Sequence, residues 1–310
     1  MTSRTSYRVR HKTEYIYASG VSTSHHEVHL YPRIAPGQTV RDKRLDVLPE
    51  PSLRRDHIDW FGNPATHLAI HTRHTRLAVT SSFVVDIARE PPPEDDGPWE
   101  AARDWVRAGA DAEARAAVEM ALPSPRIGPS SAARAFAEPS FAPGRPLAEV
   151  ARDLMHRIHE EFAYDPAATD VSTPLDDVLS GRRGVCQDFA HVQLACLRAF
   201  GLAARYVSGY LVTRREVVAA DESDLVGADA SHAWVSVRLP GGSWLDLDPT
   251  NDVVPSDRHI VVAVGRDFGD VTPMRGVLLG GGRHDLIVGV DVTPVEGQSQ
   301  SQSQNQSQSG

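Results

Sequence analysis

The chain contains two cysteines, and the first of them, Cys186, is placed where a thiol can do chemistry. It stands at the start of a predicted helix over residues 186–200, two residues after Gly184, where the backbone can approach a substrate closely. The unpaired N–H groups and the dipole at a helix N-terminus stabilise a thiolate, the form of cysteine that attacks carbonyl carbons. Most free cysteines are instead small buried hydrophobic residues, so position alone leaves both interpretations open.

Cys196 lies further along the same predicted helix and serves as an internal comparison. Its neighbours Ala195 and Leu197 are apolar, which indicates a core position. Ten residues of helix separate the two cysteine Cα atoms by about 15 Å, a distance that excludes a disulfide between them. Of the two cysteines, only Cys186 is therefore a candidate nucleophile.

A catalytic cysteine needs a base, and the chain offers 14 histidines. His191 is near in sequence, but five helical residues turn the chain by about 140°, so it points away from the face that carries Cys186. We expect it to be a surface or packing residue. His232 begins a segment of alternating residues in which it shares a strand face with Trp234. This places His232 at a strand end, where it can face a neighbouring element.

The base in turn needs a carboxylate that fixes its tautomer and stabilises the imidazolium. Asp246 and Asp248 share one face of the next predicted strand, so alternation does not choose between them. A symmetric hairpin about residues 241–242 would place His232 opposite Asn251. Bringing His232 to Asp248 then requires a bulge or a slipped turn.

The elements that position these residues divide the 310-residue chain into four parts. Residues 1–90 are β-rich, and we expect an antiparallel sandwich or barrel-like domain. Residues 91–140 are predicted as a helical and Pro-rich linker, residues 141–295 as an α+β core, and residues 296–310 as a disordered Gln/Ser tail. Strands in the core are predicted over 205–212, 233–239, 243–247, 260–264 and 286–292.

Composition excludes several function classes. The net charge of -9 and the pI of about 5.8 argue against a nucleic-acid partner, which requires a basic surface. No apolar run approaches the ~18 residues of a transmembrane helix, and the first residues lack the apolar region of a secretory signal. With two cysteines and no disulfide framework, we expect a cytoplasmic protein that has no membrane partner.

Two further features of the sequence have structural explanations. His25, Glu27 and His29 share a face if they lie in a strand, which permits a metal site. No second motif supports it, so we predict packed or solvated histidines, with no metal and no cofactor. Arg205 lies close to the predicted site, and we expect it to have a structural ion-pair partner.

Four ordered motifs resemble the core of the bacterial transglutaminase-like family, a branch of the papain-like cysteine enzymes. They are residues 184–190, 201–210, 232–235 and 244–251. The Asp-Pro-Thr-Asn stretch resembles the aspartate motif of that family, so the resemblance selects Asp248 over Asp246. Residues 1–90 are similar to the β-rich N-terminal region of bacterial members.

The resemblance implies an α+β fold in which a helix carrying Cys186 packs on an antiparallel sheet carrying His232 and Asp248. It implies a thiol enzyme that attacks amide bonds of a peptide or protein substrate and forms a thioester, without a cofactor. The sequence contains no ligand cluster that would support a calcium requirement. Water would resolve the thioester in a protease or amidase, and an amine would resolve it in a transglutaminase. The alternative is a non-catalytic peptide- or protein-binding module on the same fold, in which Cys186 is buried and unreactive. The oligomeric state stays open.

Overall fold

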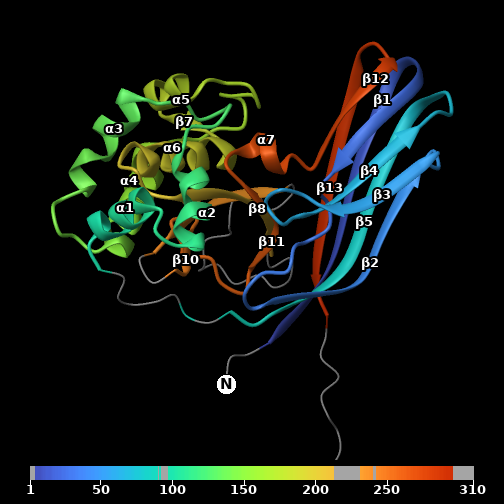
Figure 1. Ribbon diagram of the computed structural model, residues 1–310. Coiled ribbons are helices and arrows are strands. Elements are labelled where there is room, and N and C mark those ends of the chain that lie inside the picture. The colour runs from blue at the N-terminus through green and yellow to red at the C-terminus, as the bar shows by residue number, and fades with distance from the viewer. Residues whose placement is uncertain (1–3, 90, 92–96, 213–230, 240–241, 296–310) are drawn as a thin grey trace, which may run out of the picture.

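The computed structural model describes residues 4–89, 91, 97–212, 231–239 and 242–295. A large sheet of long strands lies beside a unit in which helices cover a smaller sheet (Figure 1). The Gln/Ser tail predicted at 296–310 lies outside the described residues.

The large sheet is built around β1 (Thr5–Val28), which is long enough to serve two sets of neighbours. Before a register irregularity between Ile16 and Val21, β1 pairs with β5 and β13; beyond it, β1 pairs with β4 and β12. In the described residues the order along the sheet is β2-β5-β1-β4-β3, all antiparallel. The other strands are β2 (Gln38–Leu48), β3 (Leu53–Ile58), β4 (Pro64–Ile70), β5 (His74–Ile87), β12 (Met274–Gly280) and β13 (His284–Pro294).

This sheet corrects two expectations from the sequence. The described N-terminal strands form one open sheet rather than a sandwich or barrel. Residues 274–294, assigned above to the core, pair with β1 instead (Figure 1). Alternation indicated a strand near 286–292 but carries no information about its partner, because strand pairing between distant residues depends on the whole fold.

The segment predicted as a linker is mostly helical and packed. It contains α1 (Trp99–Ala108), α2 (Ala112–Ala121), α3 (Ser131–Ala137) and the short helix η1 (Glu138–Ser140). Trp99, Ala133 and Phe136 are buried in the same hydrophobic cluster as the helix that carries Cys186. Residues 97–140 therefore belong to the folded core. No helix in the described parts of the chain is long and apolar enough to cross a membrane.

The core sheet has the strand order β10-β9-β8-β11, and every neighbouring pair is antiparallel. Its strands are β8 (Ala204–Leu211), β9 (His232–Arg238), β10 (Trp244–Leu247) and β11 (His259–Gly265). The helix α6 (Cys186–Ala199) packs against β8 and β9, and α3, α4 (Leu147–Glu161) and α5 (Leu175–Gly181) contact α6.

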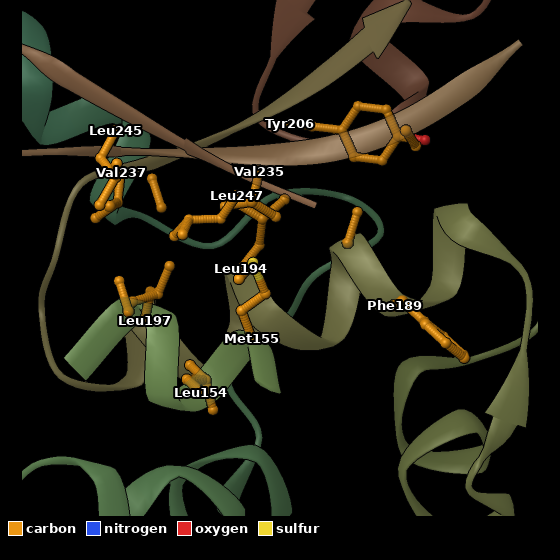
Figure 2. Close-up of a cluster of buried hydrophobic side chains, with 14 of the residues drawn as sticks. Leu154, Met155, Phe189, Leu194, Leu197, Tyr206, Val235, Val237, Leu245 and Leu247 are labelled. Carbon is orange, nitrogen blue, oxygen red and sulfur yellow. The ribbon is translucent and has the colours of Figure 1, made fainter. Parts of the chain in front are cut away.

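Alternation along the core strands gives the sheet two buried faces. Val235, Val237 and Leu247 pack with Leu194 and Leu197 in the layer between sheet and helices (Figure 2). The opposite face carries a separate cluster made of Val207, Trp234, Val261 and Val264, against which Ala35 packs. A strand buried on both sides reads as a nearly continuous apolar run, as β11 does.

Side-chain amides join the large sheet to the edge strand β11. Gln38 Nε2 donates to the Val261 carbonyl at 2.8 Å, and Gln38 Oε1 accepts from the Val261 N–H at 2.9 Å. Asn63 repeats this two-way bond on Val264, at 2.8 and 2.9 Å. These bonds satisfy backbone groups that an edge strand otherwise leaves unpaired. Asn63 directly precedes β4 (Pro64–Ile70).

His11 of β1 is a second link between the two parts. Its Nδ1 lies 2.8 Å from the Tyr210 hydroxyl of β8, and its Nε2 lies 3.0 Å from Thr13 Oγ1. The ring is almost fully buried, and burial lowers the pKa of His11 to about 4. The neutral ring is therefore the form that fits this interface.

The His11 link predicts acid sensitivity. The pKa of His11 is near 6.5 in the unfolded chain and about 4 in the folded protein. The stabilisation is thus complete above pH 6.5 and is lost as the pH falls. Between pH 7 and pH 5, the free energy of unfolding of the wild type should drop by about 2 kcal/mol more than that of His11→Gln. Urea titrations measure this, with the exposed His71→Gln as a control that should behave like the wild type.

Candidate active site

Cys186 is the first residue of α6, and a buried carboxylate holds that end of the helix. Asp188 Oδ2 accepts the Val185 N–H at 2.9 Å and the Thr169 hydroxyl at 2.6 Å. A Cβ at Gly184 would lie 2.5 Å from the same oxygen, so only glycine fits there. These contacts begin the helix at Cys186, whose side chain is partly exposed while Cys196 is buried.

Two tyrosines lie near the Cys186 thiol. The short strands β6 (Ala163–Tyr164) and β7 (Arg183–Gly184) pair in parallel and place Tyr164 beside Gly184. Burial raises the pKa of both Tyr164 and Tyr206, and the charge of the Cys186 thiolate raises each of them further. Among the described residues, the Cys186 N–H donates no hydrogen bond, as is usual in the first turn of a helix.

His232 begins β9 and lies in full burial between a carboxylate and the thiol. Its Nε2 is 2.8 Å from Asp248 Oδ2, and both side chains are wholly buried. Its Nδ1 is buried and has no hydrogen-bond partner among the described residues, so this nitrogen is free to interact with the Cys186 thiol. Burial alone would lower the pKa of His232, but the Asp248 carboxylate and then Cys186 outweigh it and raise the pKa to about 10.

The turn after β10 gives Asp246 and Asp248 different partners, which strand alternation alone could not predict. Leu247 pairs with Val235 and Asp246 with Ser236, one residue away from the symmetric register considered above. The strand ends there, and a bridge between Asp248 and Val253 closes a tight turn. Asp248 consequently reaches His232. Asp246 instead accepts from the Ser236 hydroxyl at 2.5 Å and pairs with Arg89 at 2.9 Å.

Asp248 has further partners that the sequence did not indicate. His259 Nε2 lies 3.2 Å from Asp248 Oδ2, and Asn251 Nδ2 donates to the same oxygen at 2.8 Å. The Thr250 N–H donates to Oδ1 at 3.0 Å. Despite burial, His232 and His259 hold the pKa of Asp248 far below its usual range. Asn251 and Thr250 follow Asp248 in one motif, but no local signal links His259 to it.

The remaining histidine candidates lie elsewhere. His191 is buried, accepts the Phe268 N–H at 3.2 Å, and has its pKa lowered by burial to about 4. His25 lies against the ring of His67, while His29 lies 3.3 Å from the Asp59 carboxylate. Within the described ranges, no group of three or more His, Cys, Asp or Glu side chains could hold a metal ion.

Gly209 leaves the space in which the rings around Asp248 pack. It lies on β8 opposite His232, and the Trp234 ring crosses over it to contact both His232 and His259. A Cβ at this position would collide with that ring and with the Ile260 carbonyl oxygen.

We expect Gly209→Ala to lower the free energy of unfolding by about 1–3 kcal/mol, because the buried ring and the backbone must both shift. Thermal or urea unfolding measures this loss. Gly289→Ala is the matched control, since nothing lies within 4 Å of its added methyl group. An equal effect of the two substitutions would contradict the packing role of Gly209.

Both parts of the chain match known family models. The bacterial transglutaminase-like N-terminal region matches residues 7–86, and the transglutaminase-like superfamily matches residues 134–249. An uncharacterized protein of Mycobacterium tuberculosis is 42% identical over 303 residues, covering 94% of each chain. A protein-glutamine gamma-glutamyltransferase of Pseudomonas aeruginosa is 39% identical over 126 residues, which is 40% of this chain and 19% of that protein.

A solved structure shares the fold over almost the whole chain. It is described as "a Putative Cysteine Protease from Cytophaga hutchinsonii" and has a TM-score of 0.73 at 19% identity, covering 96% of this chain and 93% of that one. The α+β fold expected from the sequence is thereby confirmed. With an N-terminal β region and a core that both match, the chain belongs to the transglutaminase-like superfamily and carries the N-terminal region of its bacterial members.

Proposed function

We propose that the protein is a thiol enzyme that acts on amide bonds of peptides or proteins through Cys186, His232 and Asp248. The observation that carries the proposal is the buried 2.8 Å pairing of His232 with Asp248 beside the thiol of Cys186 at a helix N-terminus. A raised pKa keeps His232 protonated at neutral pH, so it can stabilise a thiolate and later donate its proton.

The arrangement supports a two-step reaction. The Cys186 thiolate attacks the amide carbonyl carbon, a C–S bond forms, and the oxygen becomes an oxyanion that the Cys186 N–H can stabilise. His232 gives its proton to the leaving nitrogen as the C–N bond breaks, which leaves a thioester. Water or an amine then attacks the thioester, His232 accepts the proton of the attacking group, and the C–S bond breaks. Asp248 keeps the ring oriented throughout.

A binding module on the same fold is the competing proposal, and the exposure of the thiol weighs against it. Such a module predicts a buried and unreactive Cys186, yet Cys186 is partly exposed, whereas Cys196 is fully enclosed. Burial also raises the pKa of the Cys196 thiol, so Cys196 is the inert one.

Trapping the acyl-enzyme tests the proposal. The folded wild type would be mixed with a library of glutamine-containing peptides, quenched in acid and mapped by mass spectrometry. We expect an acyl adduct on Cys186 and none on Cys196. Released ammonia or cleaved peptide without added amine would indicate hydrolysis, and incorporation of an added primary amine would indicate transamidation. Peptides that bind wild type and Cys186→Ala equally, without adduct or product, would instead establish a binding module.

A further inference from the structure

A cavity of about 680 Å³ lies on the face of the core sheet opposite α6, between that sheet and segments of the N-terminal region. Its floor comes from β8, β10 and β11, and residues 33–37 and 88–89 contribute the opposite wall. Cys186, His232 and Asp248 do not line it. A cavity of this size accommodates a small organic molecule, and sites between domains are common places for one.

Arg205 is the unusual group in this cavity. Its guanidinium lies over the face of the Trp244 ring, 3.9 Å from the ring centroid. In the described chain it makes no hydrogen bond and no ion pair, and its Nε is buried without a partner. The ion pair expected from the sequence is thus absent among the described residues. Burial lowers the pKa of Arg205 to about 10, which still leaves it charged at neutral pH.

The other arginines around the cavity have partners. Arg89 pairs with Asp246 at 2.9 Å and donates to the His259 carbonyl at 3.1 Å. Arg33 donates to the Phe61 carbonyl and to Asn63 Oδ1. Asp246, the carboxylate of the wall, is engaged by Arg89 and by the Ser236 hydroxyl. Arg205 makes no hydrogen bond or ion pair among the described residues, and the Asp246 carboxylate that attracts it through space is already paired with Arg89.

We propose that this cavity binds a small organic carboxylate, whose carboxylate group pairs with Arg205 and whose apolar body packs on the cavity wall. Arg205 is partly shielded from water, and a shielded charge is costly without an ion-pair partner, so a guanidinium without one on a cavity wall favours an anionic ligand. The planar guanidinium, held by the Trp244 ring, suits two parallel bonds to a carboxylate.

The apolar part of the wall favours an organic carboxylate over phosphate, because phosphate has no hydrocarbon group to pack there. Ile34, Pro36, Val254 and Pro255 supply apolar surface for a hydrocarbon or aromatic group. This proposal is independent of the proposed amide chemistry, because Cys186, His232 and Asp248 do not line the cavity.

Calorimetric titration of the full chain with benzoate tests the proposal at constant ionic strength, with chloride as the background salt and phosphate as a second probe. We expect saturable benzoate binding to the wild type and at least tenfold weaker binding to Arg205→Gln. Arg55→Gln, which removes an exposed arginine of β3, should bind as the wild type does. Ser243→Phe, which places a ring on an exposed part of the cavity wall and retains Arg205, should also weaken binding.

Three results would overturn the inference. They are no benzoate binding above the chloride background, equal binding by the wild type and Ser243→Phe, and phosphate binding tighter than benzoate. Ser243→Phe keeps the test decisive if Arg205→Gln fails to fold, because it leaves the Arg205 guanidinium and its contact with Trp244 in place.

Discussion

Replacing Cys186 with alanine is expected to abolish amide turnover while the protein stays folded. The residue is partly exposed at the first position of α6, and its removal leaves the contacts of Asp188 that begin the helix unchanged. Without the thiol no thioester can form, so turnover by this route should stop. Product release from the peptide library measures turnover, and circular dichroism confirms the fold.

Cys196→Ser is the matched comparison. This thiol is fully buried and donates to the Ala133 carbonyl at 3.4 Å, so the substitution places a hydroxyl in an apolar layer. We expect a loss of about 1–2 kcal/mol in the free energy of unfolding and full turnover at temperatures where the variant is folded. Equal loss of turnover in both folded variants would contradict the assignment of Cys186 as nucleophile.

Asp248→Asn should reduce turnover by about three to four orders of magnitude. The substitution nearly keeps the side-chain shape but removes the charge that raises the pKa of His232. It also places an N–H₂ group where Oδ2 now accepts from His232, His259 and Asn251. Donors then face donors, so the free energy of unfolding should fall by about 1–3 kcal/mol as well. Turnover is therefore measured below the melting temperature of the variant.

Asp246→Asn separates this effect from a general loss of charge. Asp246 lies two residues earlier on the same strand face but contacts Ser236 and Arg89 rather than His232. Its substitution should change turnover by less than about tenfold, since the His232–Asp248 pair remains intact. If Asp246→Asn is the more damaging of the two, Asp248 is not the residue that orients His232.

The fold could be predicted from the sequence as far as local patterns and family motifs reach. The helix predicted over residues 186–200 is α6 (Cys186–Ala199), and alternation located the core strands. The placement of β12 and β13 on β1 could not be predicted, because it depends on contacts between residues at opposite ends of the chain. Trp99 and Phe136 were assigned to a linker because the proline-rich sequence around them obscured the pattern of buried apolar residues to which they belong.

The candidate site could likewise be predicted only where a local motif defines it. The sequence motif selected Asp248, while the strand pattern alone left Asp246 equal to it; a one-residue difference in hairpin register and an early strand end separate them in space. His259 could not be predicted as a partner of Asp248, because it reaches that carboxylate from β11, two strands away from β9. Arg205 was expected to form an ion pair. The cavity that it lines could not be predicted, because it lies between segments that are distant in the chain.

The most direct test of the account is the rate at which iodoacetamide alkylates Cys186 at pH 6. A thiolate that is paired with protonated His232 depends on the charge of Asp248, so the account links all three residues in one measurement. We predict that Cys186 in the wild type reacts at least tenfold faster than in Asp248→Asn, with Asp246→Asn close to the wild type and Cys196 unmodified throughout. Equal rates in the wild type and Asp248→Asn, or modification of Cys196 before Cys186 in the folded protein, would contradict it.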